Sequence, residues 1–347
     1  MKILILKPSS LGDVIQALPV LRLLKLHFRD AEIFWWIDSA LAPLIEGDPD
    51  LTGVVRFERK RWAQPPHWPE MFRSLRWLRA QDFDLVIDLQ SLLRSGAFAW
   101  LARGKFLIGL DDAREGAHGF YDVSVPRKTF HTHAVDWYLA VLPELGVPVH
   151  KNFQWLPERP QIAADVKRKW PEADSKFKTQ NSKLILLQPG ARWENKRWPV
   201  ENFSQLVSLL AQKFPLTRFA ILGSSEDKPL GEIISHAAPD HCLNLCGATS
   251  LPEMIEWIRL CDFMITNDTG PMHVAAALGK PLVALFGPTE PRRTGPYGQL
   301  ENVLRIELPC SPCLKSFCTW KNPNECLNAI SPATVFERVQ KQFGLHS

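Results

Sequence analysis

The sequence has no uncharged apolar stretch of about 18 residues, the length that a membrane-spanning helix requires. Its N-terminus, MKILILKPSS, places only four apolar residues directly before Lys7, too few for the apolar core of a secretory signal. We therefore expect a cytoplasmic protein. Cysteine is sparse too: there are seven, and an odd number in a long cytosolic chain does not indicate a disulfide framework.

The chain also has little net charge. Lysine and arginine total 41 against 37 aspartates and glutamates, and the resulting net charge of +4 gives no reason to expect a nucleic acid partner. Hydrophobic residues make up 46% of the chain and charged residues 22%, which excludes a disordered or collagen-like protein. Because 347 residues are too many for one ordinary core, we expect two domains.

Short apolar runs alternate with helix-like segments in both halves of the chain. The runs expected to form strands are residues 3–7, 33–37, 85–89, 184–188, 218–222, 263–266 and 281–286. Helical periodicity is found at residues 14–24, 202–214, 251–260 and 273–278. This alternation predicts a doubly wound parallel sheet in each half, and the polar stretch 157–183 is expected to be the crossing between them.

Three turns follow predicted strands and open predicted helices, the position at which α/β proteins bind ligands. The first, KPSSLGD at residues 7–13, contains no G-x-G-x-x-G dinucleotide fingerprint. Its Asp13 can cap the following helix, or it can face a ligand and serve as a general base. The residue types alone leave both roles open.

The second turn is PGARWENKRWP at residues 189–199. It combines a glycine with Arg192, Lys196 and Arg197, a set that suits a phosphate or diphosphate. A solvated surface loop could have the same composition, so this interpretation also has an alternative.

The third turn is NDTGPMH at residues 267–273. Backbone N–H groups of Thr269, Gly270 and Met272 could bind phosphate oxygens, and Asp268 could hold sugar hydroxyls. His273 lies within the first helical turn, where it is either a ligand or simply packed in the core.

Four of the cysteines lie within 17 residues, at positions 310, 313, 318 and 326. Their spacing matches no standard pair of C-x-x-C zinc units, which leaves free thiols, a bound metal and an oxidised pair all open. We expect this segment to be a structural appendage of the second domain without a catalytic role.

Positive charge is concentrated in one segment of the first half. Residues 56–79 contain seven basic and two acidic side chains, 7 − 2 = +5, interleaved with Trp62, Trp68, Phe72 and Trp77. One interpretation is a solvated helix face with extended arginines. The other is a site for an anionic, membrane-associated substrate.

These turns together resemble a known family of enzymes. The segments that carry the resemblance are KPSSLGDVIQALPVLRLLK, DLVIDLQSLLRSG, PGARWENKRWP and TNDTGPMHVAAALGKPLVALFGPTEP. The combination of SSLGD, KRWP and NDTGPMHVAAALG is specific, and the resemblance runs nearly end to end. The chain is similar to the ADP-heptose:lipopolysaccharide heptosyltransferases of glycosyltransferase family 9.

The resemblance implies a GT-B fold, in which two Rossmann-like domains lie on either side of a cleft. Residues 1–165 would bind the acceptor and residues 166–347, including the cysteine segment 310–326, would bind the ADP-sugar. The activity implied is inverting glycosyl transfer from ADP-heptose, with Asp13 as the base and without an essential metal or other cofactor. The expected donor-binding residues are Lys196, Glu226, Asp268, Thr269, Gly270 and His273. The expected acceptor-binding residues are Ser10, Gly12, Arg59, Lys60, Arg61 and Arg114.

The first half is most like heptosyltransferase I, which adds heptose to the Kdo of the inner core. The segments concerned are SSLGDV, DLQSLLRS and residues 113–116. The expected partner is Kdo2-lipid A or inner-core lipopolysaccharide, met by a peripheral protein on the inner face of the inner membrane. Heptosyltransferase II or another family 9 transferase is the nearest alternative, followed by a GT-B nucleotide-sugar epimerase and a non-catalytic lipid-A-binding protein.

Overall fold

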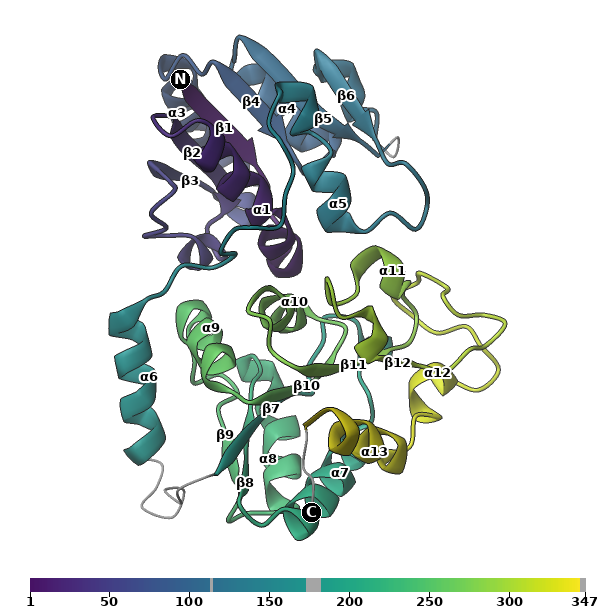
Figure 1. Ribbon diagram of the computed structural model, residues 1–347. Coiled ribbons are helices and arrows are strands. Elements are labelled where there is room, and N and C mark those ends of the chain that lie inside the picture. Colours follow the sequence, from purple (N-terminus) through teal and green to yellow (C-terminus); the bar gives the residue numbers. More distant parts are fainter. Residues whose placement is uncertain (113–114, 173–181, 344–347) are drawn as a thin grey trace. The chain divides into compact units, whose positions relative to one another are not determined.

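A computed structural model describes residues 1–112, 115–172 and 182–343 of the chain (Figure 1). Contacts between Cα atoms divide the chain into two units, Met1–Pro157 and Glu158–Ser347. Each unit is built on one six-stranded sheet, and every paired strand runs parallel to its neighbour. The doubly wound α/β class expected from the sequence is confirmed in both units.

The sheet of the first unit has the strand order β3-β2-β1-β4-β5-β6. Its strands are β1 (Lys2–Leu6), β2 (Glu32–Asp38), β3 (Gly53–Phe57), β4 (Leu85–Asp88), β5 (Phe106–Asp111) and β6 (Val123–Pro126). The first strand lies between β2 and β4, with Leu6 opposite both Trp36 and Asp88. The direction of winding therefore reverses at β1, and α/β proteins bind ligands at the carboxyl ends of strands beside such a point.

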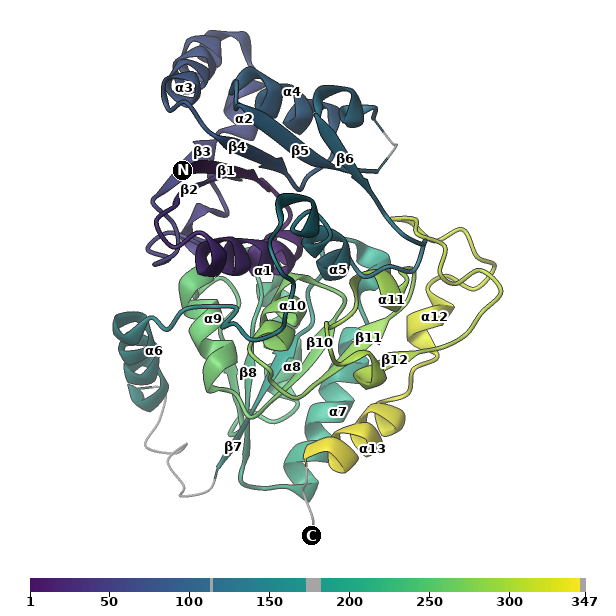
Figure 2. The ribbon, with the colours of Figure 1, turned by 45° about the horizontal axis from the view of Figure 1, so that its top comes forward.

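Helices cover both faces of this sheet. They are α1 (Leu11–His27), α2 (Arg59–Trp62), α3 (Trp68–Ala80), α4 (Leu93–Leu101) and α5 (Ala134–Leu139). Figure 2 shows α1 and α5 on one face and α2, α3 and α4 on the other. Aromatic rings fill the second face, where Trp36 lies 4.3 Å from Phe57 and 5.0 Å from Phe98 between ring centroids. Because both faces are covered, the strands are continuous apolar runs rather than alternating ones.

The sheet of the second unit has the order β12-β11-β10-β7-β8-β9. Its strands are β7 (Lys183–Gln188), β8 (Thr217–Ile221), β9 (Cys242–Asn244), β10 (Phe263–Asn267), β11 (Leu282–Phe286) and β12 (Val303–Arg305). The first strand of the unit, β7, again lies between the second and the fourth, β8 and β10. The two units therefore share one winding pattern, with the reversal beside β7 in the second.

The helices of the second unit include two pairs that pack together, α7 with α13 and α9 with α10. The α-helices among the described residues of this unit are α6 (Pro160–Glu172), α7 (Val200–Lys213), α8 (Lys228–His236), α9 (Leu251–Leu260), α10 (Gly270–Ala277), α11 (Pro291–Thr294), α12 (Glu325–Asn328) and α13 (Pro332–Phe343). Phe203 and Leu210 of α7, Val335 of α13 and Phe219 of β8 belong to one buried apolar cluster. This cluster joins the helices to the sheet that carries the ligand-binding turns.

The boundary between the units differs from the one expected at residues 165 and 166. The polar stretch expected to form the crossing contains α6, which packs against α9. Lys169 of α6 also forms an ion pair with Glu253 of α9. These contacts assign the helix to the second unit, and the chain divides between Pro157 and Glu158.

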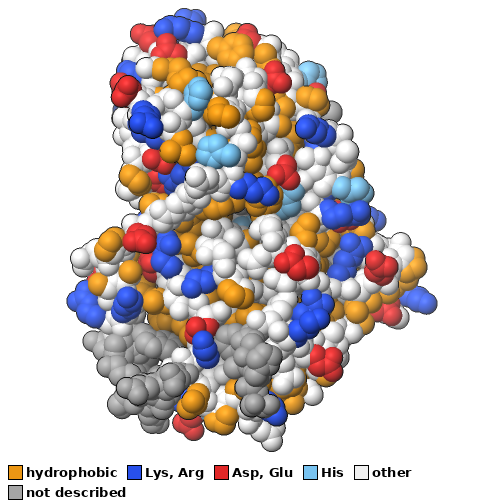
Figure 3. All heavy atoms as spheres, viewed as in Figure 1, with side chains coloured by type: hydrophobic (Ala, Val, Ile, Leu, Met, Phe, Trp, Pro, Cys, Tyr) orange, Lys and Arg blue, Asp and Glu red, His pale blue; other side chains and the backbone are white. Residues whose placement is uncertain are grey.

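The described surface is mixed in character. In Figure 3, lysine and arginine side chains lie scattered among acidic and hydrophobic ones, so no single charged field covers the face shown. No described helix is both long and apolar enough to cross a membrane.

Candidate active site

The first predicted turn, between β1 and α1, is hydrogen-bonded to the end of the neighbouring strand β4. Lys7 follows β1, and its Nζ donates a hydrogen bond to the carbonyl oxygen of Leu89, which follows β4, at 3.0 Å. The Lys7 side chain is almost fully buried, at 4% exposure. A buried lysine therefore lies at the point where the winding of the first sheet reverses.

Asp13 lies in the first turn of α1, directly after this loop, and is half-buried. Its Oδ2 accepts hydrogen bonds from the backbone N–H of Ser10 at 2.9 Å and from the Ser10 hydroxyl at 2.6 Å. The capping role considered for Asp13 is thus realised. Its second oxygen, Oδ1, accepts a longer bond of 3.2 Å from the hydroxyl of Tyr138. One carboxylate oxygen is held by the cap, and the other has a contact that capping does not require.

Tyr138 of α5 connects the aspartate to the buried lysine. Its ring lies 4.7 Å from the Nζ of Lys7 and its hydroxyl contacts Asp13. Burial and the neighbouring Asp13 carboxylate raise the pKa of Tyr138 well above its ordinary value, so the hydroxyl remains a donor. Sequence reasoning missed Lys7 and Tyr138, because only the fold brings α5 to the first turn.

A pocket of about 170 Å³ opens at the same edge of the first sheet. Ser9 of the first turn lies on it, together with Arg59 of α2, Gln90 of the loop after β4, and Arg94 of α4. Trp36 and Phe57 supply aromatic walls. Glu115 also lines the pocket, and its carboxylate accepts a hydrogen bond from the backbone N–H of Leu93 at 3.0 Å. The two guanidinium groups outnumber this one carboxylate and can hold an anionic sugar, since guanidinium pairs with carboxylates and phosphates.

The other residues expected on the acceptor side lie in different surroundings. Lys60 and Arg61 do not line this pocket, and Arg61 donates instead to Glu70 at 2.5 Å. Gly12 is buried in the first turn of α1, whereas Ser10 is exposed and occupied with Asp13. Arg114 lies outside the described residues. Of the expected cationic set that is described, Arg59 alone lines the pocket.

In the second unit the structure brings together two residues that the sequence assigned to separate turns. Lys196 Nζ forms an ion pair with Asp268 Oδ2 at 2.6 Å, and the two side chains are 18% and 5% exposed. The hydroxyl of Thr289, which follows β11, donates to the same carboxylate oxygen at 2.5 Å. Lys196 also lies 4.7 Å from the ring centroid of Trp193. The lysine expected to meet a diphosphate is therefore held in place at the carboxyl ends of three strands, β7, β10 and β11.

The turn after β10 opens the helix α10, with Thr269 at its N-cap position. Gly270 begins the helix, and His273 is buried within its first turn. The N–H of Met272 donates to the carbonyl of Thr269 at 3.1 Å, so the suggestion that this group also binds phosphate is wrong for the structure described. The amides of Thr269 and Gly270 lie at the positive end of the helix dipole, where an anion is stabilised.

Asn267 ties these turns to one another. Its buried side chain donates from Nδ2 to the carbonyl of Pro189 at 2.7 Å and accepts from the backbone N–H of Trp198 at 3.1 Å. Pro189 and Trp198 lie near the two ends of the loop that carries Lys196. Asn267 was not singled out in the sequence, although it directly precedes Asp268.

The turn after β8 also lies at the carboxyl edge of the second sheet. Asp227 is buried, and its Oδ2 accepts from the backbone N–H and the hydroxyl of Ser224 at 2.9 and 2.8 Å. A Cβ on Gly190 would lie 2.5 Å from the Asp227 carboxylate, so only glycine permits the two turns to approach. Glu226, expected to bind the donor, is exposed in this turn. It lies at the edge of the sheet that also carries Lys196.

The cysteine segment forms an irregular extension of the second unit. Cys310, Cys313, Cys318 and Cys326 are free and half-buried. Burial raises the pKa of the Cys326 thiol, as do the other three cysteines nearby. Within the part of the chain that the structure describes, no group of three or more His, Cys, Asp or Glu side chains is arranged to hold a metal ion.

Comparison with known proteins bears directly on this arrangement. The model of glycosyltransferase family 9 (heptosyltransferase) matches residues 71–323. The chain belongs to glycosyltransferase family 9. It is 30% identical to lipopolysaccharide heptosyltransferase 1 of Pseudomonas aeruginosa, over 94% of this chain and 89% of that protein. It is 28% identical to lipooligosaccharide heptosyltransferase 2 of Haemophilus influenzae, over 88% and 89% of the respective chains.

A solved structure shows that the fold is shared as well. The Escherichia coli heptosyltransferase WaaC, determined with ADP, superposes with a TM-score of 0.77 at 23% identity, over 99% of this chain and 100% of that one. The GT-B fold implied by the sequence resemblance is thereby confirmed. This family 9 member is a glycosyltransferase, and the loops that hold Asp13 and Lys196 are the candidate parts of its active site.

Proposed function

We propose that this family 9 transferase moves L-glycero-D-manno-heptose from ADP-heptose to the Kdo of the lipopolysaccharide inner core, as a heptosyltransferase I. The observation that carries the proposal is the half-buried Asp13, held through one oxygen by Ser10 and facing Tyr138 with the other. The carboxylate lies at the reversal point of the first sheet, where such folds bind ligands. An acceptor hydroxyl that displaces the long contact to Tyr138 would find a fixed base.

In the proposed reaction Asp13 takes the proton of the acceptor hydroxyl as that oxygen attacks the anomeric carbon of the heptose. The new C–O bond forms on the face opposite the leaving group, and the bond from the anomeric carbon to the diphosphate oxygen breaks. ADP leaves with the bonding electron pair. One direct displacement inverts the configuration and involves no covalent sugar intermediate.

The developing charge on the diphosphate requires stabilisation. Lys196 can supply it, because its ion pair with Asp268 keeps the ammonium group at the turn that precedes α10. The amides of Thr269 and Gly270 add the positive end of that helix. We propose that Asp268 holds donor hydroxyls, that Glu226 contacts the nucleoside, and that His273 shapes the site from its buried position.

The pocket that Ser9 of the first turn lines supports an anionic acceptor. Arg59 and Arg94 line it, and Kdo carries a carboxylate that a guanidinium group can bind in a bidentate manner. We propose that the acceptor sugar occupies this pocket and that Lys60, Arg61 and Arg114 contribute to the field around it rather than to direct contacts.

We also propose a peripheral contact with the inner face of the inner membrane. Helix α3 exposes Trp68 and Phe72, at 47% and 56%, on a helix that also carries Arg73 and Arg76 on its surface. Aromatic rings rest favourably at the headgroup level, and each basic residue adds about 1 kcal/mol near an anionic surface. This contact would bring the acceptor pocket to a lipid-linked substrate.

Relatives of both heptosyltransferase types match the chain at similar identity, so acceptor choice is the test. ADP-heptose is incubated with Kdo2-lipid A and, separately, with the product that already carries the first heptose, and ADP release and product mass are followed. We expect transfer to Kdo2-lipid A at a rate at least tenfold higher. Preferential transfer to the heptosylated acceptor would replace heptosyltransferase I by heptosyltransferase II, and ADP-heptose turnover without acceptor would contradict transfer altogether.

A further inference from the structure

A second pocket in the first unit lies at the edge of the sheet opposite the proposed acceptor site. Its volume is about 360 Å³. Gly104 and Lys105, which line it, come directly before β5, and Asp122 comes directly before β6. Since parallel strands place their amino ends at one edge and their carboxyl ends at the other, this pocket is separate from Asp13.

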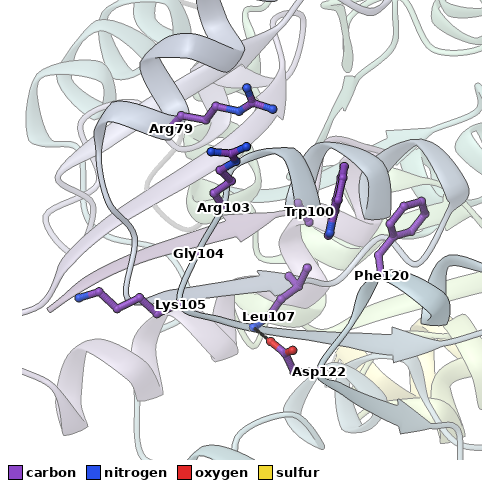
Figure 4. A pocket seen from close by; sticks show the side chains of 9 residues that line it. Arg79, Trp100, Arg103, Gly104, Lys105, Leu107, Phe120 and Asp122 are labelled. Atoms are coloured by element: carbon purple, nitrogen blue, oxygen red, sulfur yellow. Dashed lines mark hydrogen bonds between the residues drawn. The ribbon is translucent and has the colours of Figure 1, made fainter.

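Two arginines meet at one end of this pocket. Figure 4 shows the side chains of Arg79 and Arg103 lying together, although they come from the last turn of α3 and from the residues after α4. Arg79 Nε donates to the backbone carbonyl of Leu101 at 2.9 Å. Within the described part of the chain, no carboxylate forms an ion pair with either guanidinium group. Two like charges held together without a counter-charge create a place for an anion.

The other charged groups of the pocket are already engaged. Lys105 forms an ion pair with Asp84 at 2.6 Å, and in Figure 4 it points away from the two arginines. Asp122 accepts a hydrogen bond from the backbone N–H of Leu107 at 2.7 Å. Asp122 lies at the other end of the pocket in the same view, so its negative charge does not neutralise the arginine pair.

Aromatic side chains form the wall next to the arginines. Trp100 is 59% exposed, and its ring centroid lies 6.4 Å from that of Phe120. An exposed tryptophan beside cationic groups can cover the apolar or sugar part of a ligand while its anionic part meets the guanidinium groups. The pocket therefore combines a site for a phosphate with a surface for the group that the phosphate carries.

We propose that this pocket binds a phosphate ester, with Arg79 and Arg103 contacting the phosphate and Trp100 covering the esterified group. Guanidinium donors match the geometry of phosphate oxygens, and two of them supply paired hydrogen bonds. The ester is either a phospholipid headgroup or a soluble sugar or glycerol phosphate. The inference does not depend on the heptosyl transfer reaction, because none of these residues belongs to the proposed active site.

The indole N–H signal of Trp100 in 15N-labelled protein reports on the pocket, and it is assigned by its loss in Trp100→Phe. Glycerol 3-phosphate is titrated into the full chain, into Arg103→Gln, and into the control Arg29→Gln, which changes an exposed arginine of the first unit outside both the pocket and α3. The Trp100 signal should shift to saturation in the full chain and in Arg29→Gln. In Arg103→Gln the dissociation constant should rise at least tenfold.

Sedimentation with vesicles distinguishes the two sources of the ester. Binding to phosphatidylglycerol vesicles that Arg103→Gln weakens more than Arg29→Gln identifies a lipid headgroup. Equal sedimentation of the two variants, together with a Trp100 shift that Arg103→Gln weakens, identifies a soluble ester. A Trp100 signal that does not move with glycerol 3-phosphate, or that moves equally in Arg103→Gln, overturns the proposal.

Discussion

Two carboxylates of this chain make nearly the same capping contacts in different surroundings. Asp13 accepts from the N–H and hydroxyl of Ser10, and Glu253 accepts from the same groups of Ser250 at 2.8 Å each. Glu253 then pairs with Lys169, whereas Asp13 contacts the buried Tyr138. Each carboxylate thus has one oxygen in the cap, and the two differ in the partner of the second oxygen: a lysine for Glu253 and a buried tyrosine hydroxyl for Asp13.

In the proposed donor site, a single substitution at Lys196 gives a testable prediction. Lys196→Ala removes the ammonium group that lies 2.6 Å from Asp268 and should weaken ADP-heptose and ADP binding roughly 10- to 100-fold, since a charge-assisted contact contributes about 1.5–3 kcal/mol. Binding is measured by calorimetric titration with ADP. Lys213→Ala, at an exposed position of α7, is the control and should bind ADP normally. Unchanged ADP affinity in Lys196→Ala would exclude this lysine from the donor site.

Single residues were predictable from the sequence where a motif surrounds them. Asp13, Lys196 and Asp268 all lie in turns whose residue types indicate ligand binding, but their partners come from distant parts of the chain. Tyr138 is 125 positions from Asp13, and nothing in its own segment indicates that contact. The pairing of Lys196 with Asp268 likewise depends on β7 and β10 being neighbours, which only the sheet order determines.

At the scale of elements, the loops of the second unit form one connected structure. Asn267 ends β10 and hydrogen-bonds to both Pro189 and Trp198. The loop of residues 189–199, which carries Lys196 and is called the donor loop below, therefore cannot shift independently of the turn that opens α10. The ammonium group of Lys196 is thereby fixed relative to the amides of Thr269 and Gly270. Such preorganisation stabilises charge that develops on a leaving group.

Asn267→Ala tests this connection. It leaves a buried carbonyl and a buried N–H without partners, which should lower the free energy of unfolding by about 1–3 kcal/mol and weaken ADP binding. Chemical denaturation and ADP titration measure the two effects. The control is Asn328→Ala, because Asn328 makes the same kind of bond to the carbonyl of Pro323 at 3.1 Å on the surface. Equal effects of the two substitutions would mean that Asn267 does not organise the donor loop.

Two neighbouring residues of the basic segment 56–79 can distinguish a contact in the acceptor pocket from a general effect of positive charge. Arg59 lines the pocket and the adjacent Lys60 does not, although both belong to α2 and both are exposed. Arg59→Ala should therefore raise the KM for Kdo2-lipid A roughly tenfold, as expected for the loss of one charge-assisted contact, and leave the KM for ADP-heptose unchanged. Lys60→Ala should change the acceptor KM by less than threefold.

A similar rise for Arg59→Ala and Lys60→Ala, abolished by added salt, would indicate general attraction to an anionic surface instead of a contact in the pocket.

The elements that the sequence predicted are those with long apolar runs. Every strand expected from such a run is present, including β1, β4 and β10, with ends shifted by at most a few residues. Among the described strands, β3, β5, β6, β9 and β12 were not predicted. The last three have only three or four residues each, and an arginine interrupts the apolar run of β3 and a glycine that of β5. Parallel pairing supplies the hydrogen bonds that define these strands, and pairing between distant segments leaves no local periodicity.

At the scale of the whole molecule, both units wind in the same order, and each places its candidate ligand residues beside its first strand. The first unit supplies a carboxylate and guanidinium groups, and the second supplies an ammonium group and a helix N-terminus. Because the ammonium group and the helix N-terminus of the second unit provide positive charge for the diphosphate, transfer should continue in EDTA at a rate within twofold of the untreated enzyme. Loss of transfer in EDTA, with recovery on adding Mg²⁺, would contradict this assignment.

The measurement that tests the central claim most directly is single-turnover transfer by Asp13→Asn. With ADP-heptose and Kdo2-lipid A the rate should fall roughly 10²- to 10⁴-fold, the contribution expected of a general base. ADP affinity should be unchanged, and any loss of stability should match that of Glu253→Gln, which disturbs the corresponding cap of α9 and should retain full transfer. Transfer by Asp13→Asn within a factor of a few of the unmodified enzyme would contradict the account and leave Asp13 as a helix cap.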